Sequence, residues 1–113
     1  MLGYEFAHLG VNLPTREASM ALAERFEAAF GFAVKPGNSS NFAGEGIEIM
    51  NSEYLGEHGH IAVRTNSIAR ALADLEARGF TADESTAKIK GGRVTSVYLD
   101  GDFGGFRVHL LQK

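Results

Sequence analysis

Three histidines and one glutamate have the residue types and the placement to bind a metal ion together. His8, Glu48, His60 and His109 each lie in a short stretch with the alternating pattern of a β-strand. Because successive side chains of a strand point to opposite faces, each of the four lies on the face opposite to the aliphatic residues of its strand. Imidazole and carboxylate groups suit a borderline divalent ion such as Zn, Ni, Co, Fe(II) or Mn. The pattern predicts one such ion, provided that the strands bring the four residues together.

The distribution of these residues also leaves a second interpretation open. They are far apart in the sequence and do not form a short ligand motif. A single histidine in a strand is often hydrogen-bonded or exposed to solvent, so four unrelated surface residues remain an alternative on the pattern alone. The chain contains no cysteine, which excludes disulfides and thiolate ligands. Any metal must therefore be held by nitrogen and oxygen atoms.

Two arginines share the faces of predicted ligands. Arg64 follows His60 by four residues and Arg107 precedes His109 by two, so each arginine lies on the same face of its strand as the histidine. Two guanidinium groups near a metal would bind a carboxylate or a phosphate. The pattern thus predicts an anionic ligand. The alternative is that both arginines reach solvent, or that one of them pairs with an acidic residue.

The elements that must position these residues repeat the same order twice. Thr15 is a candidate N-cap of a first helix, and Gly31 is placed to end it. Asn66 or Ser67 caps a second helix, which Gly79 ends. The predicted strands cover residues 4–12, 32–36, 39–43, 46–51, 59–65, 80–84, 94–100 and 105–112. The sequence therefore predicts an α+β fold in which two βαβββ units form a curved, cup-like mixed sheet.

The length and composition are those of one ordinary domain. Its 113 residues, 44% of them hydrophobic and 22% charged, predict a single domain over 1–113, with one repeat at about 3–51 and another at about 58–112. A net charge of −3, without a basic cluster of the size that neutralises a phosphate backbone, argues against a nucleic-acid partner. No signal peptide and no apolar run of about 20 residues is visible. We expect a cytoplasmic protein that does not bind a membrane.

Four segments carry a resemblance to a known superfamily. These segments are Phe6–Val11, Gly46–Met50, Gly59–Val63 and Gly104–Leu110. In order, and across essentially the whole chain, they resemble the four ligand strands of the vicinal oxygen chelate superfamily. That superfamily includes glyoxalase I, bleomycin- and fosfomycin-resistance proteins and extradiol dioxygenases. The resemblance implies that His8, Glu48, His60 and His109 are the four ligands of one divalent ion.

The fourth predicted ligand departs from the glyoxalase pattern. In glyoxalases of the bacterial type the ligands are His, Glu, His and Glu, whereas the last position here is His109. The glutamate of the last strand is a candidate base for the isomerisation of the hemithioacetal, and a coordinated histidine is a poor base. The departure implies weak or absent isomerisation of the methylglyoxal–glutathione hemithioacetal.

A longer run of residues indicates a narrower branch. The stretch Lys35–Gly44, followed by Gly46–Met50, is similar to a glyoxalase-like domain associated with 2-keto-3-deoxy-6-phosphogluconate and 2-keto-4-hydroxyglutarate aldolases. The chain is too short for an aldolase barrel, and no sequence context for a Schiff-base lysine is visible. The resemblance therefore implies an association with an aldolase rather than aldolase activity.

The superfamily resemblance implies a metal-dependent lyase or isomerase acting on a small metabolite with adjacent oxygens. Glu48 and Tyr98 are the candidate bases, and Ser96, on the same face as Tyr98, is a candidate substrate-binding residue. Tyr98 could equally be a packed aromatic residue with a hydrated hydroxyl. Two other classes stay open: an accessory or sensor domain linked to a keto-acid sugar aldolase, and a ligand-sequestering protein of the resistance type. We also expect a homodimer, because relatives often build their sites across a two-fold interface.

Overall fold

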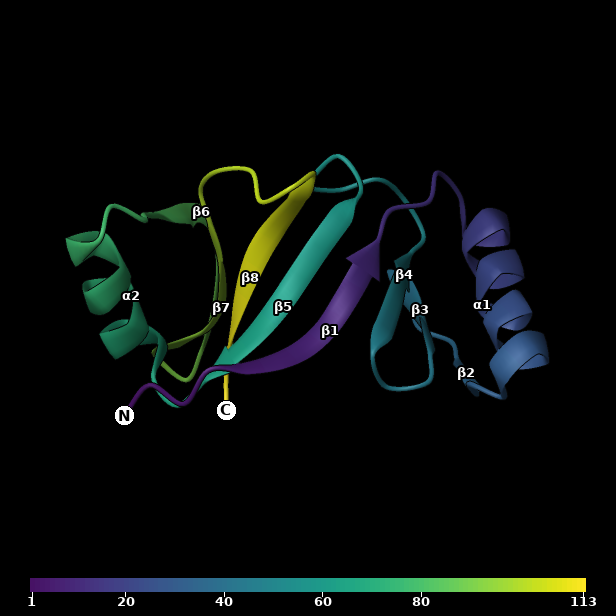
Figure 1. The fold of residues 1–113 in the computed structure, drawn as a ribbon, viewed down its shortest axis with the longest axis horizontal. Coiled ribbons are helices and arrows are strands. Elements are labelled where there is room, and N and C mark those ends of the chain that lie inside the picture. The colour runs from purple at the N-terminus through teal and green to yellow at the C-terminus, as the bar shows by residue number, and fades with distance from the viewer. The chain divides into compact units, whose positions relative to one another are not determined.

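The computed structural model describes residues 1–113 and contains two helices and eight strands (Figure 1). The elements are β1 (Glu5–Val11), α1 (Arg16–Phe30), β2 (Val34–Lys35), β3 (Ser40–Ala43), β4 (Ile47–Met50), β5 (Gly59–Thr65), α2 (Ile68–Ala77), β6 (Ala82–Lys90), β7 (Arg93–Leu99) and β8 (Phe106–Gln112). Strands pair both in parallel and in antiparallel orientation. The predicted α+β fold with a repeated βαβββ order is confirmed. The chain divides into a first unit, His8–His60, and a second unit, Met1–Ala7 with Ile61–Lys113.

In the first unit, α1 packs against strands in the order β2-β3-β4-β1. β4 pairs with β1 in parallel and with β3 in antiparallel orientation. Ala23 of α1, Ala43 of β3 and Ile49 of β4 form the buried core, and Ile47 packs against them. Because Ile47 and Ile49 face the helix, Glu48 between them lies on the opposite face of β4. The predicted assignment of faces in this strand is thereby confirmed.

In the second unit, α2 packs against β7 and β8. Its core consists of Ile68, Ala71, Val97, Leu99 and Leu110. Tyr98 lies between two of these core residues on β7, and His109 precedes another on β8. Tyr98 and His109 are also direct cross-strand partners. Both side chains therefore lie on the face of the strands that α2 does not cover.

The first residues of the chain belong with its second half. The backbone carbonyl of Leu2 accepts a hydrogen bond from the N–H of Asn66 at 2.8 Å, and another from the hydroxyl of Thr65 at 2.8 Å. The N–H of Lys113 donates to the carbonyl of Thr65 at 3.0 Å. These bonds join both ends of the chain to the end of β5. The two compact units are consequently not two consecutive stretches of the sequence.

The ends of both helices follow from local sequence. The hydroxyl oxygen of Thr15 accepts the N–H of Ala18 at 3.1 Å, and Gly31 takes the left-handed conformation with φ of 74°. Both predicted ends of α1 are confirmed. Of the two candidate caps of α2, the residue that caps is Ser67, whose side chain accepts the N–H of Arg70. Neither helix is long and apolar enough to cross a membrane.

One strand is longer than predicted. The sequence predicts a strand over 80–84, whereas β6 runs from Ala82 to Lys90 and joins β7 through Gly91 and Gly92. These two glycines have φ of 59° and 76°, the conformation of a tight two-residue hairpin turn. The register shifts along β6, and Thr86 accepts the N–H of Tyr98 there through its hydroxyl oxygen. Because of this irregularity, the second half of β6 lacks the regular alternation of polar and apolar residues from which strands are predicted.

Two isoleucines allow a matched test of the first unit's core. Ile49→Ala should lower the free energy of unfolding by about 2–5 kcal/mol, because it opens a cavity under α1. Ile89→Ala, at a side chain that is 68% exposed, should change it by less than about 0.5 kcal/mol. Chemical denaturation followed by circular dichroism measures both values. Equal effects of the two substitutions would contradict the assignment of Ile49 to the core.

Candidate metal centre

Three strands bring His8, Glu48 and His60 together in the first unit. His8 lies in β1, Glu48 in its parallel partner β4, and His60 at the start of β5. The backbone N–H of Asn12 donates to the carbonyl of His58 at 3.0 Å. This bond ties the end of β1 to the chain just before His60. The structure thus gathers three of the four predicted ligands into one cluster.

The distances within this cluster fit a shared metal ion. The Nε2 atoms of His8 and His60 are 3.2 Å apart, and Oε1 of Glu48 lies 3.2 Å from the first and 3.1 Å from the second. Two ligand atoms that bind one ion at about 2.1 Å lie roughly 3.0–3.4 Å apart in octahedral or tetrahedral geometry. Two imidazoles and one carboxylate are also a usual ligand set for Zn or Fe(II). The residues present therefore fit a divalent transition-metal ion.

The carboxylate of Glu48 is held in its charged form. Burial opposes ionisation and acts to raise its pKa, but hydrogen bonds from His60, His8 and Ser40 act in the other direction. The net effect is a pKa well below the usual range of a glutamate. The side chains of His8 and Glu48 are 13% and 19% exposed, so neither is fully buried. Glu48 is therefore charged at neutral pH, as a metal ligand would need to be.

Packing fixes the rings of both histidines. Phe42 on β3 meets His8 edge-on, with ring centroids 5.6 Å apart at an angle of 80°. The ring of His60, only 2% exposed, lies directly over the backbone of Gly10. A Cβ atom on Gly10 would come within 2.0 Å of Cε1 of His60. The absence of a side chain at Gly10 therefore leaves the space that the imidazole ring of His60 occupies.

The loop that leads into β5 is held by a single side chain. Nδ2 of Asn12 lies 3.2 Å from the carbonyl oxygen of Tyr54 and 3.0 Å from that of Gly56, and donates toward both. Asn12 follows β1 directly, so the same residue fixes this loop by its side chain and by its backbone. Hydrogen bonds from Asn12 thus hold the segment just before His60 next to the end of the strand that carries His8.

The other predicted site residues lie in the second unit. His109 on β8 stacks on Tyr98 of β7 with ring centroids 4.2 Å apart and nearly parallel planes. Tyr98 is 6% exposed and Ser96 is 5% exposed. Ser96 therefore carries a buried hydroxyl on the strand that also holds Tyr98.

Both predicted anion-binding arginines have acidic neighbours. The guanidinium group of Arg107 donates two hydrogen bonds to the carbonyl of Leu99, at 3.1 and 2.9 Å, and lies 3.8 Å from Asp83. Nε of Arg64 lies 3.8 Å from Glu5, and both of these side chains are largely exposed. The contacts of Arg107 hold β6, β7 and β8 together, which gives this residue a structural role.

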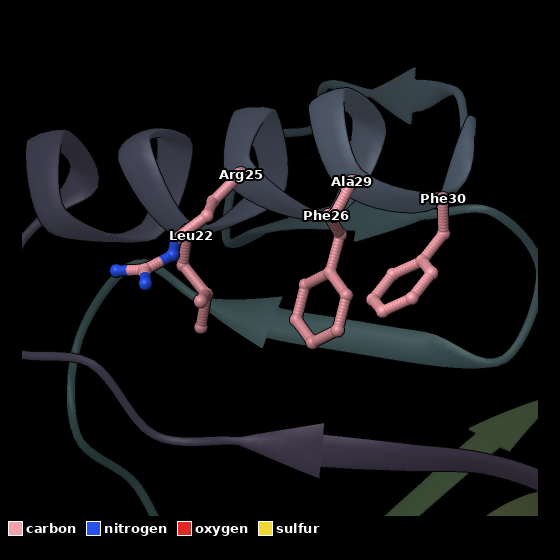
Figure 2. Close-up of a pocket in the computed structure, with 5 residues that line it drawn as sticks. All are labelled: Leu22, Arg25, Phe26, Ala29 and Phe30. Carbon is pink, nitrogen blue, oxygen red and sulfur yellow. The ribbon is translucent and has the colours of Figure 1, made fainter.

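A separate hollow runs along α1 (Figure 2). It has a volume of about 290 Å³ and is lined by Leu22, Arg25, Phe26, Ala29 and Phe30. Its walls are apolar, and Arg25 is its only ionisable group. A hollow with this lining has no acid, base or metal ligand, so we place the candidate site at the histidines.

Comparison with known proteins supports the fold. No protein-family model matches the chain, and no curated protein matches it significantly. A hypothetical protein from Bacillus halodurans is 12% identical over 98% of this chain and 95% of its own, with a TM-score of 0.67. A methylmalonyl-CoA epimerase variant from Streptomyces coelicolor, in complex with 2-nitronate-propionyl-CoA, is 16% identical over 96% of each chain, with a TM-score of 0.65. The fold is glyoxalase-like. Because such a fold hosts many activities, the function of this chain must be argued from its own residues.

Two glycines test the packing of His60. Gly10→Ala should weaken metal binding at least 10-fold, because the added methyl group displaces the imidazole ring by steric overlap. Gly46→Ala is the matched control, since nothing lies within 4 Å of a Cβ at that position. Isothermal titration with Zn or Co measures the affinities, and circular dichroism verifies that both variants are folded. Unchanged affinity in a folded Gly10→Ala protein would contradict the described packing.

Proposed function

We propose that this protein is a metal-dependent lyase or isomerase that acts on a small metabolite with adjacent oxygens. The observation that carries the proposal is the cluster of His8, Glu48 and His60, whose three ligand atoms lie 3.1–3.2 Å from one another. A partly buried arrangement of this kind, in a glyoxalase-like fold, supports a metal site with chemistry of its own. The likeness to an epimerase supports the isomerase class.

A divalent ion held there would act as a Lewis acid that polarises a carbonyl and stabilises negative charge on the oxygens next to it. The residues divide the remaining tasks. The imidazoles of His8 and His60 supply neutral nitrogen ligands. Glu48, with its lowered pKa, is a weak proton acceptor near neutral pH, which favours the ligand role over the base role. Tyr98 is the other candidate to move the proton.

His109 is proposed as the fourth ligand, as the sequence predicts. A set of three imidazoles and one carboxylate has a charge of −1, supplied by Glu48 alone. We therefore expect the activity to differ from that of bacterial glyoxalases, in which two glutamates bind the ion. The association with a keto-acid sugar aldolase remains a prediction of the sequence and would place a keto acid among the candidate substrates.

The charge balance of the cluster supports an anionic ligand. A divalent ion bound to two neutral imidazoles and one carboxylate keeps one uncompensated positive charge. A carboxylate, or the anion formed by losing a proton next to a carbonyl, would neutralise this charge. Arg64 and Arg107, which the sequence predicts to bind an anion, are the candidates for binding the anionic group of such a ligand. We propose a small oxygenated anion as the substrate class.

Purified protein should bind about one divalent ion per chain, and His60→Ala should abolish this binding because it removes one of three clustered ligands. His58→Ala is the matched control, since His58 is a histidine with a 61% exposed side chain only two residues away. Elemental analysis after equilibration with Zn, Ni, Co or Mn gives the stoichiometry.

The same pair of variants tests catalysis. The metal-loaded protein and His58→Ala should exchange the proton next to the carbonyl of a keto acid or ketoaldehyde for deuterium, whereas His60→Ala should not. Mass spectrometry of the substrate after incubation in D₂O measures the exchange. A stoichiometry near zero with all four metals would contradict the proposed metal site. Full exchange by His60→Ala would contradict a role of this site in catalysis.

Citrate, phosphate or a keto acid should raise the melting temperature of the metal-loaded protein, by mass action on the folded state. The shift should be smaller without metal, because the uncompensated charge is then absent. Arg64→Ala and Arg107→Ala show how much of the remaining anion response depends on each arginine. Differential scanning fluorimetry measures all the shifts. Equal responses with and without metal, in every variant, would favour a neutral ligand.

A further inference from the structure

The second oxygen of Glu48 is engaged by a serine. Oγ of Ser40 donates a hydrogen bond to Oε2 of Glu48 over 2.6 Å. Such a short bond from a hydroxyl to a carboxylate is charge-assisted and among the stronger hydrogen bonds in proteins. Ser40 is only 7% exposed, so solvent competes little for this hydroxyl. The two oxygens of Glu48 therefore differ: Oε1 faces both histidines, and Oε2 faces the serine.

Strand pairing explains how the serine reaches this oxygen. Glu48 of β4 is the direct cross-strand partner of Phe42 of β3. Ser40 lies two residues before Phe42, on the same face of β3, and is the diagonal neighbour of Glu48. One face of β3 thus supports two ligands, with Phe42 against His8 and Ser40 against Glu48.

Buried hydrogen bonds on the other face of β3 keep Ser40 in place. Asn41, which is completely buried, donates through Nδ2 to Ser19 of α1 and to Asn51, each over 3.0 Å. The hydroxyl of Ser19 in turn donates to the carbonyl of Ile49 at 2.9 Å. These bonds join α1, β3 and β4 directly beside Ser40. The serine is therefore part of a fixed framework.

We propose that Ser40 is a positioning residue that restricts Glu48 to binding the ion through Oε1 alone. A carboxylate that is free to turn can bind an ion through both oxygens and so occupy two coordination positions. The hydrogen bond to Ser40 holds Oε2 away from that role and leaves the second position for a substrate oxygen. This inference rests on the proposed metal site. It assigns to Ser40 an effect on the number of protein oxygen atoms that bind the ion, as well as on the affinity for the ion.

Cobalt binding followed by visible absorption tests the inference without any substrate. Ser40→Ala should bind Co²⁺ about 10- to 100-fold more weakly, and its visible bands should lose intensity because a carboxylate bound through both oxygens raises the coordination number. Ser39→Ala is the matched control: it changes the same residue type at the preceding, exposed position. It should match the wild type in affinity and spectrum.

A second pair of variants separates the hydroxyl from the volume of the side chain. Ser40→Thr keeps a hydroxyl and Ser40→Val does not, although threonine and valine have nearly the same size. Ser40→Thr should keep the wild-type spectrum and Ser40→Val should have that of Ser40→Ala, which also decides the matter if Ser40→Ala fails to fold.

The outcomes of this experiment are distinct. If the wild type does not bind cobalt, the proposed metal site itself fails. If the wild type binds and the variants without a hydroxyl keep its spectrum, the role of Ser40 in restricting Glu48 is overturned while the metal site stands. Weaker binding together with weaker bands, in Ser40→Ala and Ser40→Val but not in Ser39→Ala, supports the inference.

Discussion

The partly buried negative charge of Glu48 sets the main constraint on the first unit. Removing a carboxylate from water costs free energy unless its oxygens are hydrogen-bonded or bound to a cation. Two imidazoles and a serine hydroxyl surround it, and each comes from a different strand. β1, β3 and β5 must therefore all be in place around β4 before the charge is accommodated. The position of the charge follows from β4, whose isoleucines anchor the opposite face against α1.

The support of each candidate ligand is of a different physical kind. Glu48 accepts a hydrogen bond from Ser40, and His8 packs against the ring of Phe42. The ring of His60 occupies the space that the missing side chain of Gly10 leaves open. None of these supports is a ligand itself. Each restricts the orientation of one ligand, so that the three ligand atoms already lie within coordination distance of one another. Such preorganisation reduces the ordering cost of binding an ion.

The strand faces and the residues that cluster on them could be predicted from the sequence because a strand has a side-chain period of two. Glu48 must oppose Ile47 and Ile49 whatever the rest of the chain does, and helix ends such as Thr15 depend only on neighbouring residues. Ser40 was missed because its role depends on the register between β3 and β4. The turn between those strands is short enough that counting back from it could have placed Ser40 beside Glu48. The contacts of Arg107 with Leu99 and Asp83 depend on how three strands pair, which the alternation of residues within one strand does not predict.

The two clustered histidines are the first and the last residue of the first unit, His8–His60. Their imidazole nitrogens are 3.2 Å apart, although 52 positions separate them along the chain. An ion shared by them would act as a clasp on a closed loop of polypeptide that contains α1, β2, β3 and β4. Any local opening that separates the ends of this loop would have to break a metal–nitrogen bond. Occupancy of the ion would thus govern how often the segment between the histidines opens, even where that segment lies far from the ion.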